Sequence, residues 1–185
     1  VDGSLPKAGP ISHHPHIRRM LMTMRALTEG CRAMALVAAA SYDAAHSHPD
    51  AEVRKQNLAF YEFLVPLVKG LSTEMSLDVA SLGVQVHGGM GFIEETGAAQ
   101  YLRDAKILSI YEGTTAIQAN DLVGRKTGRD GGATASEVWR RAGALMAHNP
   151  DMPRVRPLHP YPVDRLDSAL PARVPSVSAA HTAPS

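Results

Sequence analysis

Residues 15–46 read PHIRRMLMTMRALTEGCRAMALVAAASYDAAH, and this stretch decides the class of fold. Its apolar residues recur every three or four positions, at Ile17, Met20, Met24, Leu27, Cys31, Met34 and Ala38. That spacing places them in one stripe along an α-helix. Pro15 suits the first turn of such a helix, where a missing N–H group is no loss. The stretch therefore predicts one long helix with a single apolar face.

Two more helical patterns follow the segment HSHPD at residues 46–50. The first begins near Ala51 and is predicted to end at Pro66, because proline lacks the N–H group that continues a helix. The second covers residues 71–86 and is predicted to stop at Gly88-Gly89, since glycine commonly ends helices.

Shorter helices are predicted beyond this glycine pair. One has Thr96 as its candidate N-cap, and another, capped by Thr114 or Thr115, runs to about residue 126. Strand signals are almost absent from the sequence. We therefore expect an all-α fold, an antiparallel helical bundle.

The chain is expected to divide into four parts. Residues 1–13 form a lead-in loop rich in Gly, Pro and Ser, and residues 14–128 form the bundle. Residues 129–148 are expected to add a further helix. The segment 149–185 holds 8 of the 13 prolines, so an irregular or disordered tail is expected there.

Composition excludes several classes of function. The formal net charge of +1 gives no reason to expect a nucleic-acid or membrane-surface partner. The single cysteine, Cys31, forms no internal disulfide, and no stretch resembles a membrane span or a signal peptide. His13, His14 and His16 lack a carboxylate or cysteine at ligand spacing, so no metal site is expected. These features predict a soluble, cytoplasmic protein.

The first candidate site is QVHGGMGF, residues 85–92. Three glycines within four residues let the backbone turn sharply and approach another body closely. Exposed N–H groups on such a turn can hold pyrophosphate oxygens, with the Gln85 amide as a further donor. The alternative is a helix end followed by a tight turn, with Gly88 and Gly89 serving only the backbone.

The second candidate site is the joint Tyr111-Glu112-Gly113-Thr114, which lies between two helical patterns. The apolar neighbours Ile107, Leu108, Ile110 and Tyr111 are expected to exclude water from Glu112 and make it a better base. Gly113 leaves room for a ligand, and Tyr111 and Gly113 are expected to contact the substrate. The alternative is a surface carboxylate that favours the positive end of the next helix.

In this order and at this spacing, the segments resemble the C-terminal helical domain of the flavin-dependent acyl-CoA dehydrogenases. The resemblance covers about residues 15–127, and its segments are QVHGGMGF at 85–92, YLRDAKI at 101–107, IYEGT at 110–114 and Ile117-Gln118. Flanking segments such as HPHIRRMLMTMRA are similar to the longer bacterial branch of that family.

The resemblance implies an activity and a cofactor. In the family, the glutamate at the position of Glu112 removes the α-proton of an acyl-CoA, and the β-hydrogen leaves as hydride to FAD. The product is a trans-2-enoyl-CoA. Thr114 matches a position that contacts FAD, whereas Gln85, Gly88 and Gly89 match the turn that reaches the FAD of a neighbouring subunit.

The resemblance also implies partners and a limit. Relatives are homo-oligomers that commonly pass electrons to an electron-transfer flavoprotein. The family has an N-terminal helical domain and a middle β-domain that this sequence lacks, so the chain is expected to be a fragment that is inactive alone. Ala116 departs from the acidic or amide residue that relatives often carry. Two alternatives stay open: a non-catalytic helical interaction module derived from the family, and a related acyl-CoA oxidase.

Overall fold

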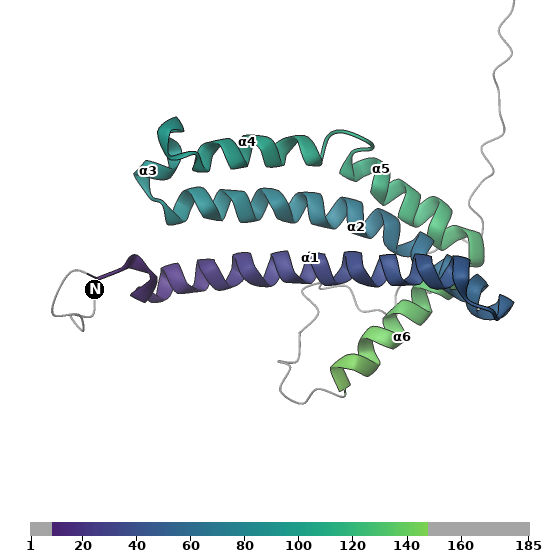
Figure 1. The fold of residues 1–185 in the computed structure, drawn as a ribbon. Helices are drawn as coiled ribbons and strands as arrows, with labels where there is room; N and C mark the ends of the chain where they lie inside the picture. The colour runs from purple at the N-terminus through teal and green to yellow at the C-terminus, as the bar shows by residue number, and fades with distance from the viewer. Residues whose placement is uncertain (1–8, 148–185) are drawn as a thin grey trace, which may run out of the picture. The chain divides into compact units, whose positions relative to one another are not determined.

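The computed structural model describes residues 9–147 (Figure 1). The chain divides into two compact units, residues 1–141 and residues 142–185. Of the second unit, only the last turns of one helix belong to the described part. Both candidate sites lie in the first unit.

Two long helices lie side by side in this unit, α1 (Pro15–Ser47) and α2 (Ala51–Val86) (Figure 1). Asp50 caps α2, because its carboxylate accepts the Glu52 N–H at 2.8 Å. The Arg54 guanidinium donates to the carbonyl oxygens of His48 and Pro49, at 2.7 and 2.9 Å. These bonds fix the reversal between the helices. The helix predicted over residues 15–46 is confirmed.

The predicted break at Pro66 is wrong, since α2 passes through this residue without interruption. Pro66 has no N–H to offer the carbonyl of Glu62, a loss that typically costs about 3 kcal/mol. The proline ring is buried, and α2 packs along its length against α1, α3 (Gly89–Phe92), α4 (Ala98–Leu108) and α5 (Thr115–Asn120). This packing offsets the missing bond, because burial on several sides stabilises a helix more than local propensity does.

The chain turns sharply after α2. Gly88 has a positive φ of 61°, and α2 ends at Val86, which confirms the predicted glycine stop. A short helix α3 (Gly89–Phe92) and a 3₁₀ turn (Glu94–Thr96) lead into α4 (Ala98–Leu108). The Thr96 prediction is wrong. Gly97 occupies the N-cap position, and the Thr96 hydroxyl donates instead to the carbonyl oxygens of Met90 and Ile93.

Helix α5 (Thr115–Asn120) begins with the predicted cap, since the Thr114 hydroxyl oxygen accepts the Ile117 N–H at 3.4 Å. It continues as a π-helical segment (Asp121–Thr127) and a 3₁₀ turn (Gly128–Asp130). The last helix is α6 (Ala133–Ala147). Before α6, Asp130 accepts hydrogen bonds from the Thr134 hydroxyl and nearby backbone N–H groups, which lower the pKa of this carboxyl.

The all-α prediction is confirmed, because residues 9–147 form helices and turns without a strand. Helix α2 is central and packs against α1, α4 and α5. No helix within the described part of the chain is long and apolar enough to cross a membrane. The predicted division into four parts stays a prediction, and the expected tail at 149–185 lies outside the described residues.

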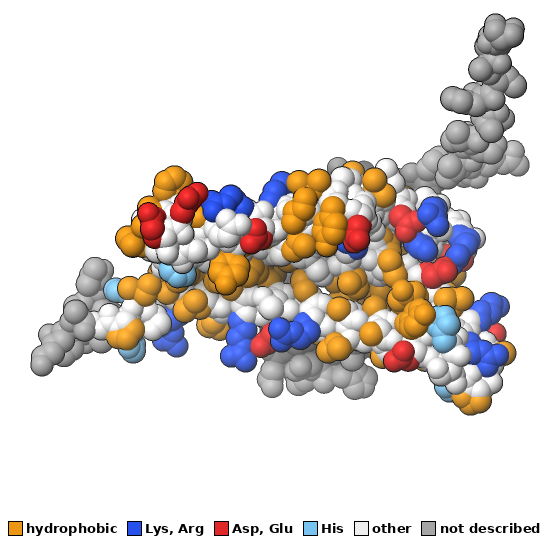
Figure 2. Space-filling model, turned by 45° about the horizontal axis from the view of Figure 1, so that its top comes forward, with side chains coloured by type: hydrophobic (Ala, Val, Ile, Leu, Met, Phe, Trp, Pro, Cys, Tyr) orange, Lys and Arg blue, Asp and Glu red, His pale blue; other side chains and the backbone are white. Residues whose placement is uncertain are grey.

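The hydrophobic core is thin. Among the described residues, the buried hydrophobic ones are Met20, Ala38, Phe63, Leu64, Ala98 and Ala105. Many large hydrophobic side chains are exposed, and Figure 2 shows them along the helices among charged groups. The helices thus carry apolar faces that residues 9–147 do not themselves cover.

The burial of residues in α1 predicts how alanine substitutions at Met20 and Met22 change the free energy of unfolding. Met20 is 2% exposed and Met22 is 70% exposed, two residues apart on the same helix. We expect Met20→Ala to lower the free energy of unfolding by about 2–4 kcal/mol, because it removes buried methylene groups and leaves a cavity. Met22→Ala should change it by less than about 0.5 kcal/mol. Urea denaturation followed by circular dichroism measures both, and equal effects would contradict the assigned faces of α1.

Candidate active site

The joint between α4 and α5 has an unusual backbone. Glu112 has φ of 53°, and it is the one residue other than glycine with a positive φ in the described range. A left-handed conformation costs an ordinary residue roughly 1–2 kcal/mol, so surrounding contacts must maintain it. Gly113 follows with φ of 95°, a value that suits glycine. The predicted carboxylate therefore lies at a strained turn.

Gly113 is also tightly packed. A Cβ atom built on it would lie 2.8 Å from Nε2 of Gln118, a residue of α5. The same Gln118 side chain lies against Gly70 of α2, where a built Cβ would contact its Cβ atom at 3.4 Å. Gly70 is buried. Small residues on both sides thus let α5 approach α2 and bring the joint against the central helix.

Lys69 of α2 binds the joint directly. Its ammonium nitrogen donates to the carbonyl oxygens of Leu108 and Tyr111, at 2.8 and 3.0 Å. It also lies 4.5 Å from the centroid of the Tyr111 ring. The end of a helix carries unpaired carbonyl groups and partial negative charge, which a cation stabilises. Lys69 therefore satisfies the end of α4 and holds the peptide group before Glu112.

A second contact ties the far side of the joint to the same helix. The Thr115 hydroxyl, at the start of α5, donates to a carboxylate oxygen of Glu74 on α2. Both Lys69 and Glu74 are half-buried. Sequence reasoning missed them, although Lys69 is the only Lys or Arg between Lys55 and Arg103. A single positively charged residue in a segment without other Lys or Arg indicates that its side chain is paired with a polar group in the fold.

The expected burial of Glu112 is not found. Glu112 is exposed, and the side chains that were expected to exclude water are open themselves. Ile107, Ile110 and Tyr111 are 52%, 50% and 45% exposed. The physical reason is that α2 covers only one side of the joint. Within the described residues, the apolar neighbours in the sequence do not cover the carboxylate.

The glycine turn lies at the other end of α4, beside α3 (Figure 1). Gln85, Gly88 and Gly89 are all exposed. No atom of the described chain lies within 4 Å of a Cβ atom built on Gly88 or Gly89. The Gly88 N–H donates to the carbonyl of Gln85 at 3.0 Å, and the Gly91 N–H to that of Gly88 at 2.9 Å. The turn is thus rigid and open to a close approach from outside.

The structure does not bring the two candidate sites together. On α2, Lys69 is the residue bonded to the joint, and Val86 is the last residue before the glycine turn. They are 17 residues apart along one helix, or roughly 25 Å at a rise of about 1.5 Å per residue. Glu112 and the glycine turn therefore cannot contact one another within one chain.

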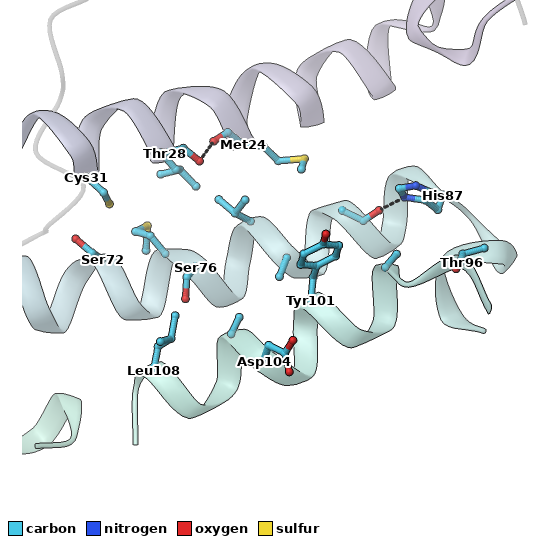
Figure 3. A pocket seen from close by; sticks show the side chains of 17 residues that line it. Met24, Thr28, Cys31, Ser72, Ser76, His87, Thr96, Tyr101, Asp104 and Leu108 are labelled. Atoms are coloured by element: carbon cyan, nitrogen blue, oxygen red, sulfur yellow. Dashed lines mark hydrogen bonds between the residues drawn. The ribbon is translucent and has the colours of Figure 1, made fainter. Parts of the chain in front are cut away.

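An apolar groove of about 700 Å³ runs between α1, α2 and α4 (Figure 3). Side chains from all three helices line it, among them Cys31, Ser76 and Tyr101. His87, within the glycine-turn segment 85–92, lines this groove, whereas Gln85, Gly88 and Gly89 do not. The four residues of the joint, 111–114, are also absent from its lining, so the groove is separate from the joint.

No metal centre emerges from the part of the chain that the structure describes. Across residues 9–147, no group of three or more His, Cys, Asp or Glu side chains is placed to hold a metal ion. The three histidines near the N-terminus lie at the 3₁₀ turn Ile11–His13 and the start of α1.

The sequence and the all-α fold agree with a known family of proteins. Residues 6–126 match the family described as "Acyl-CoA dehydrogenase, C-terminal domain". This chain belongs to the acyl-CoA dehydrogenase family. The resemblance stated from the sequence motifs is thereby confirmed at the level of the family.

Individual relatives agree with this assignment. Over 135 residues, 73% of this chain, it is 64% identical to the 3-methylmercaptopropionyl-CoA dehydrogenase of Ruegeria pomeroyi. It is 43% identical over 139 residues to the broad-specificity linear acyl-CoA dehydrogenase FadE5 of Mycobacterium tuberculosis, and 34% over 116 residues to a butyryl-CoA dehydrogenase of Syntrophomonas wolfei. The expected likeness to the long bacterial branch that includes enzymes similar to 3-methylmercaptopropionyl-CoA dehydrogenase is confirmed.

This chain matches only a part of each relative. The matched segments are 23%, 23% and 19% of the lengths of these three proteins, and 73%, 75% and 63% of this chain. The chain thus corresponds to about a quarter or less of the relatives it matches. Membership in the family follows from the match, whereas the activity of a whole relative does not.

Alanine substitutions at two glycines, one in the joint and one inside α1, are predicted to have opposite effects on the free energy of unfolding. Gly113→Ala should lower the free energy of unfolding by about 1–2 kcal/mol, because alanine resists a positive φ. Gly30, inside α1, has no atom within 4 Å of a built Cβ. Gly30→Ala should therefore raise stability by about 0.5–1 kcal/mol. Thermal and urea unfolding measure both, and a stabilising Gly113→Ala would contradict the assigned turn.

Proposed function

We propose that this chain is the part of an FAD-dependent acyl-CoA dehydrogenase that supplies the proton-abstracting base, Glu112. The observation that supports this is the position of the carboxylate. Glu112 lies in a strained turn whose backbone is bonded to Lys69 before it and, through Thr115, to Glu74 after it. Strain of this kind gathers at functional sites, because a fold must maintain it against a cost.

The proposed chemistry assigns one step to this chain. A carboxylate oxygen of Glu112 takes the α-proton of an acyl-CoA thioester, so that the α C–H bond breaks and an O–H bond forms. FAD, when bound, supplies the redox capacity by accepting the β-hydrogen as hydride. The product is the trans-2-enoyl-CoA. The backbone of Gly113 and the ring of Tyr111 are proposed to contact the acyl group beside Glu112.

The apolar side chains around Glu112 suit this role once they are covered. Ile107, Ile110 and Tyr111 are about half exposed, and Ile117 of α5 is 57% exposed. An acyl chain laid over them would bury their apolar surface and displace water from the carboxylate. The substrate itself is thus proposed to provide the desolvation that the described residues do not.

The residues assigned to FAD fit a flavin nucleotide. The open space above Gly88 and Gly89 is a cradle that a side chain would fill, and the exposed Gln85 amide stands beside it. The Thr114 hydroxyl accepts the Ile117 N–H, which leaves its own O–H free to donate to a bound flavin. Ala116 brings no polar group to this region.

The separation of about 25 Å between the turn and the joint supports a shared site. We propose that Thr114 and Glu112 serve the flavin of their own subunit, whereas Gln85, Gly88 and Gly89 reach the flavin of a neighbour. A homo-oligomer is then required for a complete site, and the exposed apolar faces of the helices suit association.

Other parts of the proposal follow from the family. The proposed substrate is an acyl-CoA, the proposed electron acceptor is an electron-transfer flavoprotein, and the proposed location is the cytoplasm. The chain alone is proposed to be inactive, since catalysis requires flavin and acyl group to be positioned together. The thin core with many exposed hydrophobic side chains also suits a second candidate function, a non-catalytic helical interaction module.

The role of Glu112 is tested in a chimeric enzyme. In the 3-methylmercaptopropionyl-CoA dehydrogenase of Ruegeria pomeroyi, the matched segment is replaced by the corresponding 135 residues of this chain. We expect the chimera to reduce its flavin when an acyl-CoA is added. Glu112→Gln should slow this step by at least about 100-fold, because the amide cannot accept the proton. Stopped-flow absorbance of the flavin measures the rate.

A matched control separates this effect from a general loss of charge. Glu95, in the 3₁₀ turn before α4, is exposed and far from the joint in the chain. Glu95→Gln should leave the rate of flavin reduction unchanged. An unchanged rate in the Glu112→Gln chimera would refute the proposed base and favour the interaction module.

A further inference from the structure

We propose that Lys69 is the positioning residue of this site: its ammonium group holds the backbone turn that presents Glu112. The observation is a set of contacts between distant parts of the chain. Lys69 donates to two carbonyl oxygens of the joint, which lie 39 and 42 residues further along the sequence. The proposed role in proton abstraction rests on the proposed function, whereas the effect on the backbone does not.

The second of these bonds acts on the conformation of Glu112 itself. The carbonyl of Tyr111 belongs to the peptide group that precedes Glu112. The angle φ of Glu112 is the rotation of the residue against that peptide plane. The Lys69 ammonium nitrogen lies 3.0 Å from the Tyr111 carbonyl oxygen and therefore fixes the orientation of this peptide group. With the peptide group fixed, φ of Glu112 stays at 53°. Released from this bond, the peptide group can turn, and Glu112 can relax to a negative φ.

The ammonium group is well suited to this task. A lysine carries three N–H donors, and Lys69 uses two of them on the carbonyls of Leu108 and Tyr111. The face of the Tyr111 ring lies 4.5 Å away and also attracts the cation. One charged group thus binds the helix end, the turn and the ring, and it does so from the half-buried face of α2.

A second bond to α2, made after the turn, also restrains the backbone around Glu112. Thr115 is bonded to Glu74 of α2, so the chain is attached to the same helix before and after Glu112. Between the two attachments, Gly113 supplies the freedom to turn. The position of the carboxylate relative to α2 is therefore set by two side chains of α2, and Lys69 is the one that acts on the peptide group next to it.

The first test is a measurement of the wild-type chain in solution. If the bond exists, NMR should detect a scalar coupling across it, between the Lys69 ammonium nitrogen and the Tyr111 carbonyl carbon. A strong intraresidue HN–Hα NOE at Glu112 should report the positive φ. Absence of the coupling under conditions where the α1 and α2 resonances are dispersed would overturn the proposal without any substitution.

The second test removes the donors. Lys69→Met keeps the length of the side chain and removes its N–H groups, so the NOE signature of positive φ at Glu112 should disappear. The control is Lys106→Met in the last turn of α4, where an exposed lysine without a side-chain bond within the described chain loses the same charge. Loss of the signature in both variants, or in neither, would overturn a specific role of the Lys69 bonds.

The catalytic consequence is measured in the chimeric enzyme. We expect Lys69→Met to lower kcat for flavin reduction by about 100-fold while KM changes little, because a displaced base misses the proton but does not weaken binding. Lys106→Met should keep kcat. If Glu112→Gln abolishes flavin reduction and Lys69→Met leaves kcat unchanged, the positioning role is wrong and the proposed function stands. If Glu112→Gln has no effect, the proposed function is wrong, and the NMR tests still decide the role of Lys69 in the turn.

Discussion

The ammonium group of Lys69, bonded to the carbonyl oxygens of Leu108 and Tyr111, is the contact on which the candidate site depends. It joins the central helix α2 to a turn that the local sequence would not maintain, since Glu112 has a left-handed backbone. A cation at the C-terminus of α4 also stabilises the partial negative charge at that end of the helix. One half-buried lysine thus gives the joint both its position and its shape.

The length of α2 sets the second constraint. Because this helix continues through Pro66, the joint at one end of α4 and the glycine turn at the other are held roughly 25 Å apart. If α2 were broken at Pro66, the helix would not fix the distance between the joint and the glycine turn. The continuous α2 therefore supports the proposal that Glu112 serves one flavin while Gly88 and Gly89 reach the flavin of a neighbouring subunit. In that proposal, the length of one helix is the physical reason for a shared site.

Much of this fold could be predicted from local patterns. The apolar stripe of α1, the glycine stop at Gly88 and the cap at Thr114 follow from periodicity and from the chemistry of helix ends. Two errors arose where other contacts in the fold override the simplest local rule. Pro66 stays helical because it is buried against neighbouring helices, and Thr96 gives its hydroxyl to the end of α3 instead of capping α4.

The sequence predicts residues for the candidate site, and that assignment stays a prediction, but it did not predict the surroundings of these residues. Glu112 and the glycine turn are visible as short motifs, whereas Lys69 and Glu74 lie about 40 residues away in sequence and required the fold to reveal them. The exposure of Glu112 was also unpredictable from its apolar neighbours. Apolar residues next to a carboxylate in sequence do not cover it unless another element packs over them.

The most direct test of the shared site is complementation between two inactive chimeric enzymes. One carries Glu112→Gln and the other Gly89→Val; the chain itself has room for a side chain at position 89, so the valine should block only the flavin. The account predicts that each homo-oligomer is inactive, and that mixed oligomers, made by co-expression, regain acyl-CoA-dependent flavin reduction. In them, one site pairs an intact Glu112 with an intact turn from the other chain. If the mixed oligomers stay as inactive as their parents, a site shared between subunits would be refuted.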